Sequence, residues 1–305
     1  MANNRTGITY WVQSPWMGIG RTVVALGQLS VFVFAEPLSL FVPVAGSSFE
    51  YSCSTWYGQF SYFCFMPSVD VACWLSVLGL VIVASGFLPT ITCVVHAYVS
   101  VSFVAVLTLP DGGDLIASAI SLLLVPLLIT DTRLSVWKPS SGGGGGIRQG
   151  IQVGSQFGLR IQVAFIYFNS ATAKFAVEPW ANGSEMYYVV RQEMFGASGW
   201  LGELSRWSTS FPLVTLGMSW GAIGIELCIV VLCFSKKKKA AIAAMSLTLF
   251  LHVGIGLLIG INSFAMIMVG AVVLAVYPAM GRHLWGGKTV NPGRNATSRM
   301  PEKVA

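Results

Sequence analysis

Long apolar runs recur along the 305 residues, and most are separated by only a few polar or glycine-rich positions. A helix needs about 20 consecutive apolar residues to cross a bilayer core about 30 Å thick. Inside lipid, each backbone N–H and C=O must find its partner within the chain, which a helix provides. The composition agrees, because 54% of the residues are hydrophobic and only 10% are charged, whereas soluble domains carry about 25% charged residues. The sequence therefore predicts an all-α, polytopic integral membrane protein.

We expect a bundle of about eight transmembrane helices. In chain order the expected spans are residues 22–44, 69–88, 91–109, a run ending near residue 130, a run beginning near residue 156, and residues 211–234, 240–259 and 264–277. The major clusters of lysine and arginine, densest at residues 236–239, lie in loops that an eight-span topology puts on one side of the membrane. By the positive-inside rule these loops are cytoplasmic, which also places the N- and C-termini in the cytoplasm. The expected localisation is multi-pass in the cell (plasma) membrane.

The chain divides into a transmembrane domain, residues 1–285, and a basic cytoplasmic tail, residues 286–305. Although the net charge is +6, the cations sit in short loops between apolar runs, so they indicate topology and the lipid bilayer rather than a nucleic acid partner. The segment around five consecutive glycines, residues 142–146, has no GK[ST] ending and no preceding strand. We interpret it as a flexible linker and not as a phosphate-binding loop.

Cys53 and Cys64 lie in a polar, aromatic loop after the first span. If that loop is extracytoplasmic, the two can form a disulfide that restricts the unfolded loop by roughly 3 kcal/mol. The alternative is two free thiols in an interfacial loop. The other four cysteines lie in apolar spans, and no CxxC or Cys/His spacing typical of a metal site is present.

Arg160, Tyr167 and Lys174 are spaced seven residues apart in the fifth span. Positions seven apart drift by only about 20° around a helix, so the three form one stripe. Such a stripe has to face protein or a wet cavity rather than lipid. Lys174 would lie about 21 Å from Arg160 along the axis, toward the outer side. It either snorkels to the outer headgroups or has a functional role.

Glu226 lies within the apolar sixth span, where an unpaired carboxylate is costly. We expect it to form an ion pair with Arg160, which enters the membrane from the same side. Arg21 is expected to anchor the inner end of the first span.

Asp114 opens the fourth span, after two glycines. It would act as the N-cap of that span, or Asp111 or Asp114 would line an outward-facing cavity. His252 lies near the middle of the seventh span.

After the fifth span, residues 178–210 are amphipathic and aromatic. We expect one or two short helices along the outer membrane interface.

The stretch YFNSATAKF at residues 167–175, followed by Trp180, Gly183, Met186 and the pair Tyr187 and Tyr188, resembles a known pattern. It is similar to the HTTM (horizontally transferred transmembrane) domain of the vitamin K-dependent gamma-carboxylase superfamily. There, a Y-(L/F)-x-A-x-x-K motif is followed by W-x-x-G and an aromatic segment. GGD at the start of the fourth span, Glu226, and HVGIGLLIGINSF around His252 also agree. The chain length and the Cys53/Cys64 loop look most like the SdpB branch, the sporulation-delaying-protein maturation family.

The resemblance implies that Lys174 matches a base that deprotonates a reduced quinone on the extracytoplasmic side. Burial among small and aromatic neighbours would lower the pKa of the lysine, as a base of this kind requires. Tyr167, Asp114 and His252 would line the same cavity as further catalytic residues, and Trp180, Tyr187 and Tyr188 would contact the substrate. The SdpB branch further implies a secreted precursor peptide as substrate and a small SdpA-like protein as partner. Because no large extracytoplasmic domain follows the last span, carboxylation of peptide glutamate is doubtful even if a quinone-type pocket remains.

Three functions compete at this point. The first is maturation of a secreted antimicrobial peptide through a cavity around Lys174. The second is a quinone-dependent membrane enzyme of gamma-carboxylase type. The third is a transporter or immunity-like binding protein without chemistry. The sequence has no internal repeat and no pair of Gly/Pro-broken helices in matching halves, and this argues against a secondary transporter.

Overall fold

The computed structural model describes residues 14–41, 53, 55–107, 111–138, 146–192 and 196–280. Within these ranges the chain is helical apart from turns and one isolated bridge between Phe87 and Ser135. The expected glycine linker lies almost entirely outside the described residues, and so does the basic tail.

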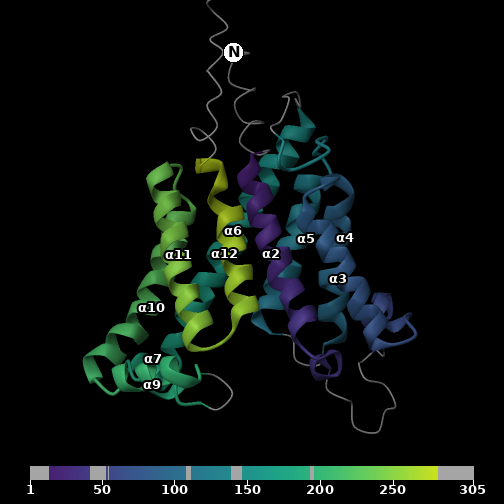
Figure 1. Cartoon of the computed structure of the whole chain (residues 1–305). Helices are drawn as coiled ribbons and strands as arrows, with labels where there is room; N and C mark the ends of the chain where they lie inside the picture. The colour runs from purple at the N-terminus through teal and green to yellow at the C-terminus, as the bar shows by residue number, and fades with distance from the viewer. Residues whose placement is uncertain are drawn as a thin grey trace, which may run out of the picture.

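Eight long helices form the bundle shown in Figure 1. They are α2 (Pro15–Phe34), α3 (Val69–Ser85), α4 (Pro89–Val106), α5 (Gly112–Leu128), α6 (Ile147–Phe175), α10 (Pro212–Cys233), α11 (Lys238–Leu258) and α12 (Asn262–Met280). Five of them, α2, α4, α10, α11 and α12, are long and apolar enough to span a membrane, and α3 and α5 are shorter apolar helices of 17 residues each. The prediction of a helical membrane protein is thus supported by the fold.

Short 3-10 turns and three short helices lie outside the long ones. The 3-10 turns are η1 (Pro37–Leu40), η2 (Gly58–Phe60) and η3 (Tyr62–Cys64). The short helices, α7 (Glu178–Ala181), α8 (Glu185–Val189) and α9 (Gly199–Ser208), follow α6 and gather at one end of the bundle, beneath α10 in Figure 1. The sequence predicts one or two short helices in residues 178–210, and the described residues there form three. We call α7, α8 and α9 the cap.

The first long helix begins and ends earlier than predicted. Pro15 occupies the first turn, where its missing N–H costs nothing, and α2 stops at Phe34. Ala35 is already extended and Glu36 precedes a proline, a position that disfavours helix. The expected inner anchor Arg21 is therefore inside the bundle, 1% exposed, where its Nη2 donates to Thr92 Oγ1 at 2.6 Å.

The turn between α3 and α4 depends on Gly86. This residue caps α3 with φ of +74°, a left-handed conformation that glycine adopts without strain. A Cβ there would also lie 2.5 Å from Nε1 of Trp137 and 2.6 Å from Val136 Cγ2. The backbone of Val136 donates to the Gly86 carbonyl at 2.9 Å, so the turn is bound to the segment that follows α5.

The long helices divide into a dense half and an open half. In the dense half α12 packs closely on α2, α2 packs on α3, and α4 packs on both α3 and α5. In the open half α6, α10, α11 and α12 form a ring in which neighbours pack but α10 and α12, which face each other across it, barely touch. A ring of this kind leaves a hollow at its centre.

Candidate functional site: an ion pair in the wall of a large cavity

The hollow in the open half is a cavity of about 1420 Å³. Its walls come from α6, α10, α11 and α12, with α5 contributing two residues, and Trp180, Met186 and Leu201 of the cap close one end. Most of the lining side chains are apolar, and the charged ones among the described lining residues are Lys174 and Glu226. This volume exceeds the roughly 300–1,000 Å³ of pockets for drug-sized ligands. The cavity is therefore large enough for an extended apolar molecule.

Lys174 lies in the last turn of α6, where a cation interacts favourably with the helix dipole. Its Nζ is 2.8 Å from Oε1 and 2.9 Å from Oε2 of Glu226 on α10. The side chains of Lys174 and Glu226 are 17% and 8% exposed. Trp180 of the cap contributes a cation–π contact, with its ring centroid 5.1 Å from the same nitrogen. The pair has no net charge, which is what an apolar wall requires.

Ser170 connects the two charges. It lies one helical turn before Lys174, whose Nζ donates to the Ser170 Oγ at 2.6 Å. The same hydroxyl donates to Oε1 of Glu226 at 3.1 Å. Ser170 is not among the site residues expected from the sequence, and its i, i+4 spacing from Lys174 is the sequence signal that indicates this contact.

His252 and Tyr167 form another part of the cavity wall. The His252 ring is 2% exposed, and its Nδ1 contacts the Thr248 carbonyl oxygen at 2.9 Å. Because a carbonyl oxygen only accepts, Nδ1 is the donor in this hydrogen bond. Tyr167, 1% exposed, meets this ring edge-on with centroids 5.9 Å apart. Three of the four expected catalytic residues, Lys174, Tyr167 and His252, therefore line one cavity.

The expected ion pair between Arg160 and Glu226 is wrong. Glu226 bonds to Lys174, and Arg160 donates from Nε to the Ala275 carbonyl oxygen at 2.9 Å. Arg160 and Lys174 are 14 residues apart on one helix, about 21 Å, so one carboxylate cannot reach both. The prediction placed Glu226 at the wrong level because it counted residues from the cytoplasmic end of each span.

Asp114, the fourth expected catalytic residue, does not line the cavity. It is 4% exposed, inside the first turn of α5. The N-cap is Asp111, whose Oδ1 accepts from the Asp114 backbone N–H at 2.9 Å. The helix begins at Gly112 rather than at the aspartate, and this shift moves the capping role to Asp111.

The expected substrate contacts divide in the same way. Trp180 lines the cavity, but Tyr187 and Tyr188 do not. The Tyr187 ring instead stacks under the Arg191 guanidinium, 3.7 Å from Cζ to centroid, and contacts Tyr188 edge-on. These two tyrosines thus help to shape the cap.

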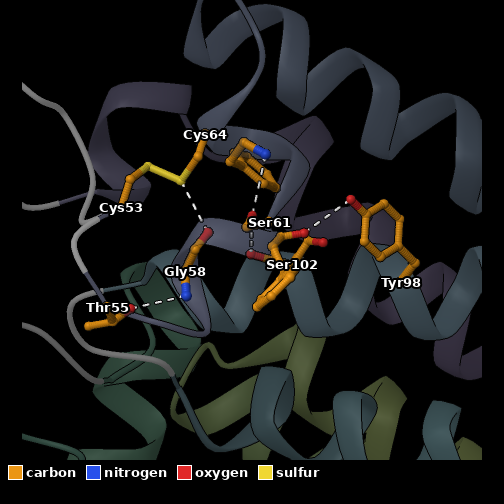
Figure 2. The surroundings of a disulfide bond; sticks show 9 residues. Cys53, Thr55, Gly58, Ser61, Cys64, Tyr98 and Ser102 are labelled. Carbon is orange, nitrogen blue, oxygen red and sulfur yellow. Dashed lines mark hydrogen bonds between the residues drawn. A yellow bond between two sulfur atoms is a disulfide. The ribbon is translucent and has the colours of Figure 1, made fainter.

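The Cys53–Cys64 disulfide is present, with Cα atoms 5.9 Å apart. Figure 2 shows how its loop is fastened to α4: Ser61 Oγ donates to the Ser102 carbonyl at 2.8 Å, and the Tyr98 hydroxyl donates to the Phe60 carbonyl at 3.1 Å. The described residues of the loop pack on the dense half of the bundle and do not line the cavity.

The dense half has its own buried polar side chains, which we call the polar seam: Arg21, Gln28, Thr92, His96 and Ser100. The Gln28 Oε1 contacts His96 Nε2 at 3.0 Å and accepts from Ser100 Oγ at 2.8 Å. The i, i+4, i+8 spacing of Thr92, His96 and Ser100 places them on one face of α4. The sequence analysis does not predict the seam, because its contacts join residues of α2 and α4 about 70 positions apart.

Comparison with known proteins gives two relatives, both from Bacillus subtilis (strain 168). The uncharacterised protein YitO is 30% identical over 290 residues, covering 91% of this chain and 91% of YitO. The sporulation-delaying protein SdpB is 25% identical over 273 residues, covering 87% of this chain and 83% of SdpB. No protein-family model and no solved structure matches the chain. The chain therefore belongs to the same SdpB-like family as YitO and is a distant homologue of SdpB.

Proposed function

We propose that this chain is a multi-pass plasma-membrane protein that takes part in the maturation of a secreted bacterial antimicrobial peptide. The similarity to SdpB over most of both chains supports a role in sporulation-delaying-protein maturation. The apolar helices support a membrane location. The substrate in this proposal is a secreted precursor peptide, and the partner is a small SdpA-like protein.

The proposed topology has eight spans with both termini cytoplasmic. One short connection joins α10 to α11, where the chain passes from Cys233 to Lys238. That connection carries Lys236 and Lys237, which favour the cytoplasmic side. The cap then faces outward, together with the end of α6 that carries Lys174. This arrangement suits a substrate that has already been secreted.

The observation that carries the proposal is the Lys174–Glu226 pair in the wall of the cavity. A buried ion pair is a weak source of stability, since desolvation offsets its attraction. Intramembrane charges are therefore functional candidates by default. Apolar walls fit the hydrophobic part of a precursor, and the pair supplies a proton donor and acceptor at one end.

A second candidate is a quinone-dependent enzyme of gamma-carboxylase type, built on an HTTM-like domain. The apolar lining and the lysine fit a quinone with an apolar tail, and a reduced quinone would supply reducing power and an acidic hydroxyl. In that case Lys174 would first have to lose its own proton to Glu226, or the ion pair would have to separate. Only then could Lys174 accept a proton from the quinone. A third candidate, binding or transport without chemistry, requires only the cavity.

The test is mass spectrometry of the secreted peptide from cells that carry or lack this chain. We expect a mass difference, and we expect Lys174→Ala to give the same peptide as the deletion strain. Arg160→Met serves as the matched control, because Arg160 lies on the same helix but bonds to a backbone carbonyl. An unchanged peptide mass in the deletion strain would reject maturation and leave the binding candidate. Normal peptide from a well-inserted Lys174→Ala protein would reject both enzymatic candidates.

A further inference from the structure

The hydroxyl of Ser170 is oriented differently from that of an ordinary helical serine. In apolar helices a serine or threonine commonly donates back to the carbonyl one turn earlier, as Ser155 does on the same helix to Ile151 at 2.8 Å. Ser170 instead donates to the Glu226 carboxylate at 3.1 Å while accepting from Lys174 at 2.6 Å. Its hydroxyl oxygen is thus held between a base and a cation.

This arrangement is that of an activated nucleophile. Such sites have a hydroxyl within about 2.6–3.2 Å of a general base, with a third group that orients the base. Here Oε1 of Glu226 is the acceptor for the hydroxyl proton, and Lys174 binds both carboxylate oxygens and so fixes the orientation of the carboxylate. The ammonium also lies beside the attacking oxygen, where it can stabilise an oxyanion.

All three side chains line the cavity and can meet a bound molecule. The rest of the lining is predominantly apolar, so the acyl group at this site would come from a hydrophobic segment. Trp180, Met186 and Leu201 of the cap line the same cavity.

We propose that Ser170, Glu226 and Lys174 form an acyl-transfer triad that hydrolyses a peptide bond within a hydrophobic segment of a membrane-associated polypeptide. The choice of polypeptide rests on the proposed function; the triad itself rests on the geometry. Ser170 Oγ attacks the peptide carbonyl as its proton passes to Glu226. The C–N bond breaks, and Glu226 returns the proton to the departing amine. Water then cleaves the Ser170 ester, with Glu226 taking the water proton and returning it to the serine. The net reaction consumes one water and yields an acid and an amine.

The direct test is labelling of the full chain in native membranes with an alkyl fluorophosphonate, followed by peptide mapping. Ser170 should displace fluoride and carry the phosphonate adduct. Glu226→Gln should slow labelling at least about 100-fold, the usual contribution of a general base, and Ser155→Ala should label like the parent. Ser170→Cys preserves a nucleophile at the same position and should react with an apolar maleimide. A folded protein without adduct at Ser170 would overturn the triad, as would an adduct confined to other residues.

The secreted peptide gives the second readout. With the triad intact, the masses of two fragments should sum to that of the precursor plus one water, and Ser170→Ala should leave the precursor whole. Normal cleavage by Ser170→Ala, combined with failure of Lys174→Ala, would remove the triad and leave the proposed function standing. If deleting the chain does not change the peptide, the proposed function falls, and the phosphonate adduct still decides whether the triad exists.

Discussion

The two halves of the bundle bury polar groups in opposite ways. In α12, which both halves share, 72% of the apolar stretch is buried, and in α4 of the dense half 56%, whereas α10 and α11 of the open half reach only 28% and 22%. The polar seam of the dense half, around Gln28 and His96, lies where helices pack tightly and does not line the cavity. The Lys174–Glu226 pair lies in the wall of the cavity, where the helices do not pack tightly. Dense packing around polar groups indicates a role in specifying the fold, and open space beside a charge pair indicates a role in binding or chemistry.

The largest effect should come from breaking the charge pair on one side only. Glu226→Gln leaves the Lys174 ammonium without its counter-charge, which for buried pairs costs about 3–5 kcal/mol; partial exposure of the lysine places the expected loss near the lower end. The free energy of unfolding in detergent measures this loss. Replacing both residues, Lys174→Met with Glu226→Leu, should restore most of the stability. Additive losses in the double variant would show that the two side chains are not coupled.

Glycine substitutions compare the packing of the halves directly. A Cβ on Gly270 of α12 would lie 2.8 Å from the backbone nitrogen of Val24 and the carbonyl oxygen of Gly20, whereas one on Gly221 of α10 meets nothing within 4 Å. Gly270→Ala should therefore destabilise by about 1–3 kcal/mol, and Gly221→Ala should be neutral or slightly stabilising. Thermal unfolding of the two variants in the same detergent provides the measurement. Equal melting temperatures would remove the distinction between a dense and an open half.

The two buried histidines should have smaller effects on stability, and different effects on peptide maturation. His96→Ala removes the contact to Gln28 and should cost about 1–2 kcal/mol of stability with maturation intact. His252→Ala should change stability less, because its only described hydrogen bond is to its own helix, and should reduce maturation. Unfolding temperatures and peptide masses, measured on the same membranes, test both statements. Reversed assignments would mean that the polar seam is the working site.

The smallest effect is expected at the cap. Trp180→Ala removes a cation–π contact worth about 0.5–1 kcal/mol and opens one end of the cavity. We expect a slight loss of stability and a measurable drop in peptide yield. Trp200→Ala is the control, since Trp200 is 75% exposed and does not line the cavity. Identical yields from the two variants would show that the cap does not shape the site.

The sequence was sufficient for the helices because each depends on local hydropathy: the order of all eight expected spans matches the long helices, and most ends agree within a few residues. Two helices are exceptions: α2 begins and ends earlier than expected, and α6 begins earlier. At the start of α6, Gln152 and Gln156 are held by Thr130 and by carbonyls of α12, contacts that no local pattern shows. The site was predicted in part. The stripe placed Lys174 and Tyr167 toward a cavity. Which residue pairs with Glu226 depends on the relative position of α6 and α10 along their axes. That position is set by helix packing and cannot be read from either helix alone.

The stable variant Lys174→Met with Glu226→Leu offers the most direct test of the central claim, that this pair in the open half is the working centre. It should insert and unfold nearly like the parent, and the peptide secreted beside it should have the mass found in the deletion strain. A peptide of mature mass from cells that carry this variant would contradict the account.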